Sequence, residues 1–340
     1  MKVYYSEAHR QHEPPFEVFD GGLRTPYMEN PDRMDRILNA LRQTDWTEIT
    51  EPRDFGLDPI QAVHTKDYVD FLASCWAEWL ASEAEDKSTL LPATFALRRH
   101  PQKPTSLLGR AGYHIMDLSA CIVEGTYAAA LASANCALSA AEAVAQGKCA
   151  AFALCRPPGH HAGKDYAGGY CFINNASVAA NWLSARGNVA VLDVDYHCGN
   201  GTQDIFYDRS DVLTISIHAD PDFEYPYYAG YAHETGSGAG LGFHKNFPLE
   251  KGTDDARYLS VLEEALALLR KFAPKHVVVS AGMDIYAADP LGKIKVSTEG
   301  IGEIGKQVSA LNLPTVIIME GGYNNEALGK NMVKFLSHFA

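Results

Sequence analysis

From about residue 128 onward, short apolar runs alternate with segments of helical character. The runs expected to form strands are Ala150–Arg156, Asn188–Asp195, Val212–His218, His276–Ala281 and Thr315–Met319. The segments expected to form helices are Ala128–Ala145, Asn174–Arg186, Asp254–Phe272, Ser297–Leu311 and Glu326–Leu336. Strands that are apolar throughout and alternate with helices are typical of a parallel sheet that helices cover on both faces. We therefore predict an α/β fold with a mostly parallel sheet.

The first part of the chain is less regular. One early strand, Lys2–Tyr5, and one helix, Asp32–Gln43, are expected there. Residues 81–125 combine Pro, Gly and charged residues with little periodicity. So long an irregular segment inside a compact domain is usually functional or part of an interface. We predict a single domain over residues 1–340 that carries a loop insertion at 81–125.

The composition is that of an acidic folded protein. The 340 residues include 29 Lys+Arg and 42 Asp+Glu, which gives a formal net charge of −13. Nucleic-acid binding depends on clustered Lys and Arg, so this balance disfavours it, whereas an acidic surface suits small cations. The Ala-rich stretch Tyr127–Gly147 is interrupted by polar residues and is not expected to span a membrane. Seven Cys, several of them in apolar runs, indicate buried free thiols and a cytoplasmic protein.

Polar clusters stand at the carboxyl ends of four of the expected strands. They are Pro157–His161, Asp193–His197, Gly282–Asp284 and Glu320–Tyr323. The carboxyl ends of parallel strands share one edge of a sheet, and the ligand crevice of open α/β sheets lies at that edge. We therefore expect the four clusters to meet in one site.

Three of these residues form a candidate metal centre. Asp195 and His197 are two positions apart at a strand end, so their side chains point to the same side. Asp284 follows another strand and completes an Asp–His–Asp set that leaves a coordination position open, as a catalytic zinc site requires. Singly, each residue is more simply explained by a loop cap, by packing or by a turn. The set favours Zn²⁺, and Fe²⁺ or Co²⁺ are possible substitutes.

The remaining cluster residues are candidates for catalysis. His160 and His161 follow a rigid Pro-Pro-Gly, and a neutral imidazole is a suitable general base for a metal-activated water. Tyr323 follows two glycines, and its phenol can donate a hydrogen bond to a developing oxyanion, although a core tyrosine is as common. Asp193 is an acid in an otherwise apolar strand and should pair with a cation or a histidine.

Other residues are weaker candidates. Tyr170, His218 and Tyr225 could line the mouth of a pocket or simply pack in the core. Asp117, in the insertion, could attract a cation, although a solvated loop acid is more common. The glycine-rich segment 236–242 lacks the Lys and the Ser/Thr of a phosphate-binding loop, and we expect an ordinary loop there.

Several long motifs together resemble the zinc-dependent histone deacetylase superfamily, which has an arginase-like α/β fold. The motifs are Arg156–His161, Gly169–Asn175, Leu192–Gln203, Ser216–His218, Ser280–Asp284 and Glu320–Tyr323. Within that superfamily the insertion before Gly125 and the segment Phe19–Gly22 are most similar to the acetylpolyamine amidohydrolases.

The resemblance implies a role for each residue of the site. The implied zinc ligands are Asp195, His197 and Asp284. His161 would be the general base and acid, with His160 as its electrostatic partner, and Tyr323 would polarise the acetyl carbonyl. Asp193 would orient His160, and Asn200 would orient His161.

The resemblance also implies a substrate tunnel, a second ion and a partner. Gly169, Tyr170 and Tyr225 would line the tunnel. A structural K⁺ would lie near Asp193, Asp195, His197, Ser216 and Ile217. The insertion at 81–125 would meet a second copy of the chain in a homodimer and narrow the tunnel rim.

These observations favour a metal-dependent amidohydrolase that removes acetyl groups from N-acetylated polyamines or diamines. The alternative is a protein acetyl-lysine deacetylase with the same chemistry and an open rim. A two-manganese ureohydrolase is disfavoured, because Gly199 stands where a further acid would be needed. A binding protein without catalysis is disfavoured because the set of ligands, His161 and Tyr323 is intact.

Overall fold

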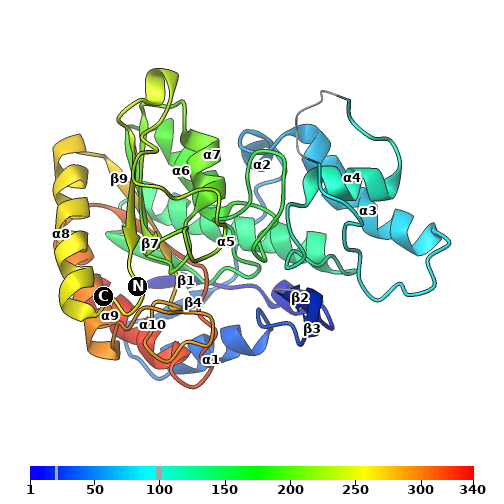
Figure 1. Cartoon of the computed structure of the whole chain (residues 1–340). Coiled ribbons are helices and arrows are strands. Elements are labelled where there is room, and N and C mark those ends of the chain that lie inside the picture. Colours follow the sequence, from blue (N-terminus) through cyan, green and yellow to red (C-terminus); the bar gives the residue numbers. More distant parts are fainter. Residues whose placement is uncertain (20–21, 97–101) are drawn as a thin grey trace.

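The computed structural model describes residues 1–19, 22–96 and 102–340, and its core is an eight-stranded sheet (Figure 1). The strand order is β4-β1-β5-β10-β9-β6-β7-β8, and every pairing is parallel. The strands are β1 (Lys2–Tyr4), β4 (Glu48–Thr50), β5 (Ala150–Ala153), β6 (Val189–Asp193), β7 (Val212–Ala219), β8 (His244–Leu249), β9 (His276–Ala281) and β10 (Thr315–Met319). The prediction of a parallel α/β sheet is confirmed.

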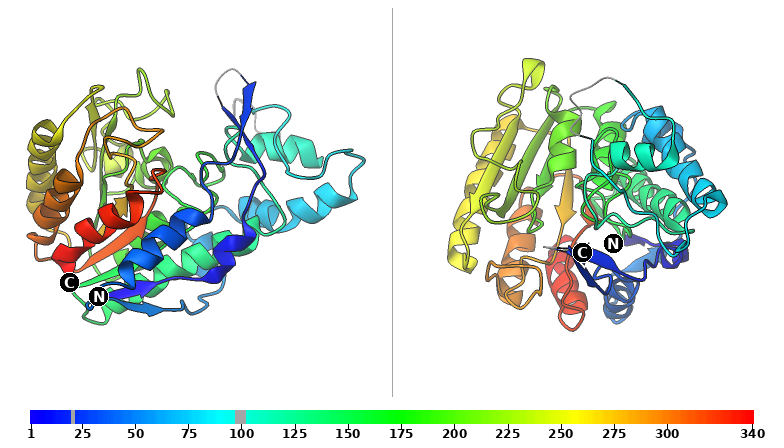
Figure 2. Two further views of the ribbon diagram at one scale, coloured as in Figure 1. Left: turned by 90° about the horizontal axis from the view of Figure 1, so that it is seen from below. Right: turned by 45° about the vertical axis from the view of Figure 1, so that its right-hand side comes forward.

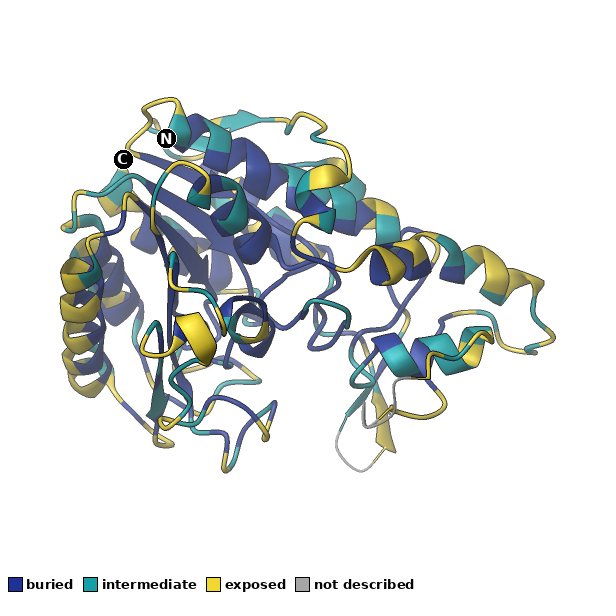
Figure 3. Ribbon diagram, turned by 90° about the horizontal axis from the view of Figure 1, so that it is seen from above, coloured by how far each residue is buried: buried dark blue, intermediate teal, exposed yellow. Residues whose placement is uncertain are grey.

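Helices cover both faces of the sheet (Figure 2). They are α1 (Asp32–Leu41), α2 (Asp58–Gln61), α3 (Lys66–Ala81), α4 (Leu107–His114), α5 (Thr126–Ala145), α6 (Asn175–Ser184), α7 (Asn200–Phe206), α8 (Asp255–Phe272), α9 (Thr298–Ser309) and α10 (Leu328–Leu336). Successive strand residues point to opposite faces, so Val278 packs with α5 and α6, whereas Val279 packs with α1, α8, α9 and α10. Figure 3 shows the sheet buried between these layers.

Helix α5 is long and apolar enough to cross a membrane by length and composition, but 67% of that apolar stretch is buried inside the protein. It contacts α6, β1, β5 and β10, and it is therefore the central helix of one layer. All seven Cys are free thiols, and six of them are buried. Thiols in such positions behave as small apolar side chains that fill the core.

Several elements were not predicted. Edge strand β8 begins with His244, Lys245 and Asn246, so it has no continuous apolar run. Edge strand β4 and the hairpin of β2 (Glu17–Phe19) and β3 (Leu23–Thr25) have only three residues per strand, too few for a periodicity.

The segment at 81–125 is also more ordered than expected. It contains α4, and its Leu90 pairs with Ile122 in an isolated bridge. With α3, it projects from the sheet core, and the hairpin of β2 and β3 projects from the core on the same side of the molecule (Figures 1 and 2). These segments together are called the arm. Residues 97–101 of the insertion, and Asp20 and Gly21 of the motif Phe19–Gly22, lie outside the described residues.

The four strands that precede the polar clusters are neighbours in the sheet. Their order is β5-β10-β9-β6, in the middle of the sheet. The register places Asp193 beside Ser280 at the carboxyl edge, and it pairs Met319 with Ala281 there. The four clusters consequently follow adjacent strands at a single edge.

Buried His64 holds the segment between β5 and α6 at two points. Its Nδ1 donates to the carbonyl oxygen of Gly163 at 2.8 Å, and its Nε2 accepts from the amide of Asn174 at 2.9 Å. These partners require the neutral imidazole, because a proton on Nε2 would face an N–H group. Burial lowers the pKa of His64 to about 4.

We therefore expect acid to destabilise the fold through His64. Between its unfolded pKa of about 6.5 and its folded pKa of about 4, the unfolded chain binds one more proton at this residue, so the free energy of unfolding falls as the pH falls. The contribution is a slope of about 1.4 kcal/mol per pH unit. Denaturant unfolding of the wild type and of His64→Gln at pH 7.5, 6 and 5 measures it. The variant should be less stable at pH 7.5 but lose less on acidification, and equal slopes would contradict the assignment.

Candidate metal and catalytic site

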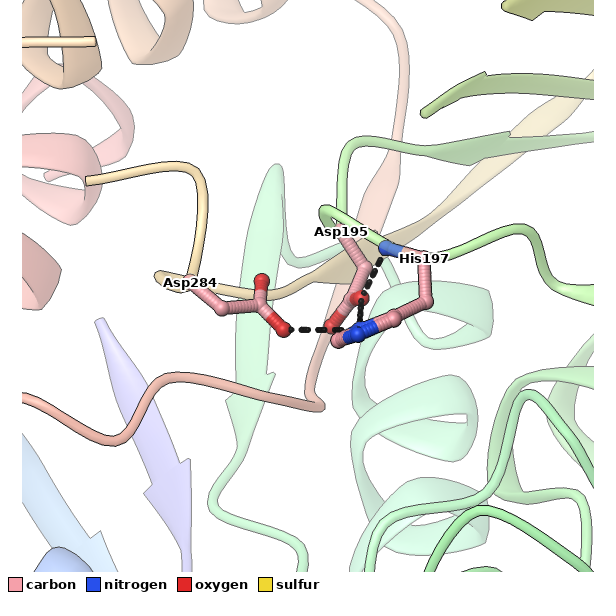
Figure 4. A group of neighbouring side chains, drawn as sticks. All are labelled: Asp195, His197 and Asp284. Carbon is pink, nitrogen blue, oxygen red and sulfur yellow. Dashed lines mark hydrogen bonds and ion pairs between the residues drawn. The ribbon is translucent and has the colours of Figure 1, made fainter. Parts of the chain in front are cut away.

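Asp195, His197 and Asp284 converge at the carboxyl edge of the sheet (Figure 4). The first two lie just after β6, and Asp284 lies just after β9. Nδ1 of His197 is 3.3 Å from Oδ1 of Asp195 and 3.2 Å from Oδ2 of Asp284. Three such donor atoms, within 4.8 Å of one another, can share one cation. The two-residue spacing and the strand ends thus bring together the set that the sequence indicated.

The backbone holds both carboxylates in place. The amide of Tyr196 donates to Oδ1 of Asp284 at 3.0 Å, and the amide of Gly321 donates to Oδ2 of Asp195 at 2.9 Å. These close approaches require glycine: a Cβ on Gly282 would lie 1.9 Å from Oδ2 of Asp195, and one on Gly321 would lie 2.2 Å from Oδ2 of Asp284.

The electrostatics of the triad favour a cation. Burial, and then the charge of Asp195, raise the pKa of Asp284 to about 7. Burial disfavours the imidazolium of His197, but hydrogen bonds to the two carboxylates outweigh it and raise the pKa of His197 to about 10. Two buried carboxylates side by side thus demand positive charge, which a divalent cation supplies. Two carboxylates and one imidazole, with a coordination position left open, fit a metal of the zinc type.

The two neighbouring histidines are held differently. Nδ1 of His160 is 2.9 Å from Oδ2 of Asp193, and Nδ1 of His161 is 2.7 Å from Oδ1 of Asn200. Because an amide oxygen only accepts, Nδ1 of His161 carries the proton and its Nε2 is left with a lone pair. The two rings lie 4.0 Å apart. Both contacts are those that the resemblance implied.

These partners separate the pKa values of the pair. Burial lowers the pKa of His161, and the neighbouring His160 and His197 lower it further. Burial also acts to lower the pKa of His160, but the charges of Asp195 and Asp193 outweigh it, and this pKa is raised. His161 is therefore neutral beside a cationic His160, so its Nε2 is able to accept a proton.

A cavity of about 460 Å³ reaches His197 of the triad. His161, His197 and Tyr323 lie in its wall, together with Gly169, Tyr170, Tyr225 and Asp117. The ring of Tyr225 packs edge-on against His161 at 4.8 Å, and Tyr170 packs against Tyr323 at 5.7 Å. Burial raises the pKa of Tyr323, so its hydroxyl remains protonated and able to donate.

Asp117 lies in the cavity wall, but protein donors occupy its carboxylate. Oδ2 accepts from the amide of Gly169 and from the hydroxyl of Tyr225, each at 2.7 Å. Oδ1 accepts from Ser119 and Ala120. These bonds fix the positions of two predicted tunnel residues.

The residues expected near a monovalent ion also lie together in the fold. Asp193 of β6 is the register partner of Ser216 in β7, and Ile217 follows it. The hydroxyl of Ser216 is 2.7 Å from Nδ1 of His218, a buried residue that the cavity wall does not include.

Two further groups in this region were not predicted from the sequence. Glu320 accepts from the amides of Gly159 and His160 and from the hydroxyl of Ser280, although its place after a buried strand was the same signal that identified Asp193. Glu224 lies in the cavity wall and accepts from Lys293 at 2.8 Å. No local pattern marks Glu224, because only the tertiary fold brings it to the cavity.

Comparison with known proteins places the whole chain in one family. The model of the histone deacetylase domain matches residues 27–339. Acetylpolyamine amidohydrolase 2 of Pseudomonas aeruginosa is 44% identical, with 100% of this chain and 98% of that protein covered. Acetylpolyamine amidohydrolase of Mycoplana ramosa is 40% identical, with 100% of both covered. The crystal structure of acetylpolyamine aminohydrolase from Burkholderia pseudomallei matches with a TM-score of 0.96 at 43% identity, covering 100% and 98% of the two chains.

We expect the purified chain to bind about one zinc ion through the triad. Asp284→Ala removes one of the two carboxylates and should lose the ion, because imidazole and a single carboxylate are a poor site for a divalent cation. Elemental analysis after dialysis measures the ion content, and added Zn²⁺ should raise the thermal midpoint of the wild type but not of the variant. Asp70→Asn, at an exposed acid of α3, is the control. Equal zinc content in Asp284→Ala and wild type would exclude the triad.

Proposed function

Because this chain belongs to the histone deacetylase family, whose members are typically zinc-dependent hydrolases, we propose that it cleaves N-acetylated polyamines or diamines to acetate and the free amine. The observation that carries the proposal is the arrangement around one cavity. A neutral imidazole with a free Nε2, the His197 member of a metal-type triad and a protonated phenol all lie in its wall. These are the parts that amide hydrolysis requires: a base, an electrophile site and a hydrogen-bond donor.

Asp195, His197 and Asp284 would hold the metal. Zinc bound there supplies Lewis acidity, which polarises the acetyl carbonyl and lowers the pKa of water. Fe²⁺ and Co²⁺ suit the same donors.

The residues of the chain divide the proton transfers. Nε2 of His161 takes a proton from the attacking water, and Asn200 holds the ring so that this atom faces the cavity. The same proton then passes to the amine nitrogen as the C–N bond breaks, so His161 returns to its neutral form. His160, charged beside Asp193, disfavours a second positive charge nearby and keeps His161 neutral before the reaction.

Tyr323 acts on the oxygen of the acetyl group. As water adds to the carbonyl carbon, negative charge develops on this oxygen, and the phenol donates a hydrogen bond to it. The raised pKa of Tyr323 keeps the donor proton in place.

The cavity wall supports a small substrate. Phe95, Met116 and Leu118 of the insertion line the cavity, so the insertion contributes to its rim. An acetylated chain with a distal ammonium suits a protein of net charge −13. Relatives that match the full length of the chain are named for acetylpolyamines.

We expect hydrolysis of a free N-acetylated diamine to exceed that of an acetyl-lysine peptide, and a chelator to abolish it. His161→Ala removes the base, and Tyr323→Phe removes the donor, so each should lower turnover by roughly 10²- to 10⁴-fold. Acetate release measures both, and unfolding midpoints near that of the wild type show that the variants are folded. Near-normal turnover in both variants would overturn the assigned roles.

The two substrates also separate the proposed function from its alternative. Strong turnover of the peptide would mean an open rim and a protein deacetylase. Turnover of neither substrate by the zinc-loaded chain would mean a binding protein that retains the fold without catalysis.

We further propose a structural K⁺ and a homodimer. The K⁺ would be held by Asp193, Asp195, His197, Ser216 and Ile217, and exchange of K⁺ for a bulky monovalent cation should then lower the thermal midpoint.

The homodimer would form through the arm. The arm exposes Leu23, Leu80 and Leu108 to 63%, 47% and 46%, an apolar surface of the kind that a second copy would cover.

Light scattering should therefore give the mass of two chains. Leu108→Glu, in α4, should shift the mass toward one chain because it buries a charge in the contact. Leu268→Glu, at an exposed leucine of α8 away from the arm, should leave the dimer intact. A single-chain mass for the wild type would contradict the proposal.

A further inference from the structure

Asp289 connects two loops that line the cavity. It lies in the segment between β9 and α9, and it is only 6% exposed. Its Oδ2 accepts from the backbone amides of Tyr323 and Asn324, at 2.7 and 3.0 Å. Its Oδ1 accepts from the amide of Leu291 at 3.0 Å. One buried carboxylate thus holds three N–H groups from two separate loops.

The contact with Leu291 is local, whereas the other two are not. An aspartate that accepts from the amide two residues ahead forms an ordinary turn. The bonds to Tyr323 and Asn324 instead cross 34 and 35 residues of sequence to the loop after β10. A turn needs no such bonds. They fix the distance between the two loops.

Both held residues matter to the cavity. Leu291 and Tyr323 each lie in its wall. The peptide before Tyr323 is fixed by Arg33, whose Nε donates to the carbonyl oxygen of Gly322 at 2.6 Å. Gly322 itself has φ +119°, a conformation that offers little resistance to rotation in glycine. The hydrogen bond from the amide of Tyr323 to Asp289 therefore fixes the direction in which the side chain of Tyr323 leaves the backbone.

We propose that Asp289 is a positioning residue for Tyr323, setting the place of its hydroxyl relative to the triad and to the wall at Leu291. The inference rests on the role of Tyr323 in the proposed function. Hydrogen bonds to a carboxylate are stronger than neutral ones, and the two that cross to the loop after β10 make a stiff connection. A displacement of about 1 Å in a catalytic group can cost about 10²-fold in rate, which is the size of effect that a looser loop would produce.

A double-mutant cycle tests the proposal. Asp289→Ala should lower kcat by roughly 10- to 100-fold and change KM little, because the substrate is still bound and only the donor is misplaced. In a Tyr323→Phe background, where no hydroxyl remains to be positioned, Asp289→Ala should lower kcat by less than about 2-fold. Equal factors in the two backgrounds would overturn the proposal, because Asp289 would then act independently of the phenol.

A conservative variant and a matched control separate positioning from general stability. Asp289→Asn keeps one acceptor oxygen and should restore part of the lost kcat, and it replaces Asp289→Ala in the cycle if the alanine variant does not fold. Asp255 of α8 accepts from the amide and the hydroxyl of Ser297, at 2.7 and 2.6 Å. Ser297 lies at the far end of the segment between β9 and α9 that also contains Asp289. Asp255→Ala should lower the thermal midpoint without lowering kcat. A comparable loss of kcat in this control would mean that loop stability alone is responsible.

The outcomes also distinguish this inference from the proposed function. If Tyr323→Phe retains the turnover of the wild type, the role of Tyr323 is wrong and the inference fails with it. If Tyr323→Phe is slow and the effects of the two substitutions simply multiply, the proposed function stands and only the positioning role of Asp289 is overturned.

Discussion

Buried negative charge at the carboxyl edge of the sheet must be matched, and the loops around the site are arranged to match it. The carboxylates concerned are Asp193, Asp195, Asp284 and Glu320, all of them buried. Asp195, Asp284 and Glu320 each accept from a backbone amide of another segment, and Asp193 accepts from the amide of Asp195. The protonated imidazole of His160 supplies part of the positive charge, and a metal ion held by the triad would supply the rest. The geometry of the site is thus a consequence of satisfying acids that cannot be left unpaired.

A second set of buried ions extends this matching to the N-terminal part of the chain. Oε1 of Glu29 accepts from Arg33 at 2.6 Å and from Arg156 at 3.0 Å. Arg33 also donates to the carbonyl oxygen of Gly322 and to that of Glu320, so α1 holds the loop that carries Tyr323. Removing one partner from such a network leaves an uncompensated buried charge, which is why its members act as a unit.

The sequence was sufficient where the signal is local. Apolar runs identify β6, β7, β9 and β10, and the polar residues after them identify the triad, because strand ends in a parallel sheet share an edge. The sequence was insufficient where a residue's role depends on contacts between segments that are far apart along the chain. Arg33 lies in a helix that is otherwise rich in charge, so nothing in the pattern marks it as buried. The part played by Asp289 depends on a contact between two loops that are far apart in sequence.

The order of strands in the sheet has a consequence for how the site comes into being. The last strand along the chain, β10, lies in the middle of the sheet between β5 and β9. As the chain leaves the ribosome, β5 and β9 therefore lack the strand between them until β10 is released. The site can be completed only after Tyr323 has been synthesised, and a chain that stops short of β10 lacks both the central strand and Tyr323. The strand that joins the two halves of the sheet and the phenol of the site thus arrive together, so a truncated chain cannot hold a partly assembled site with this geometry.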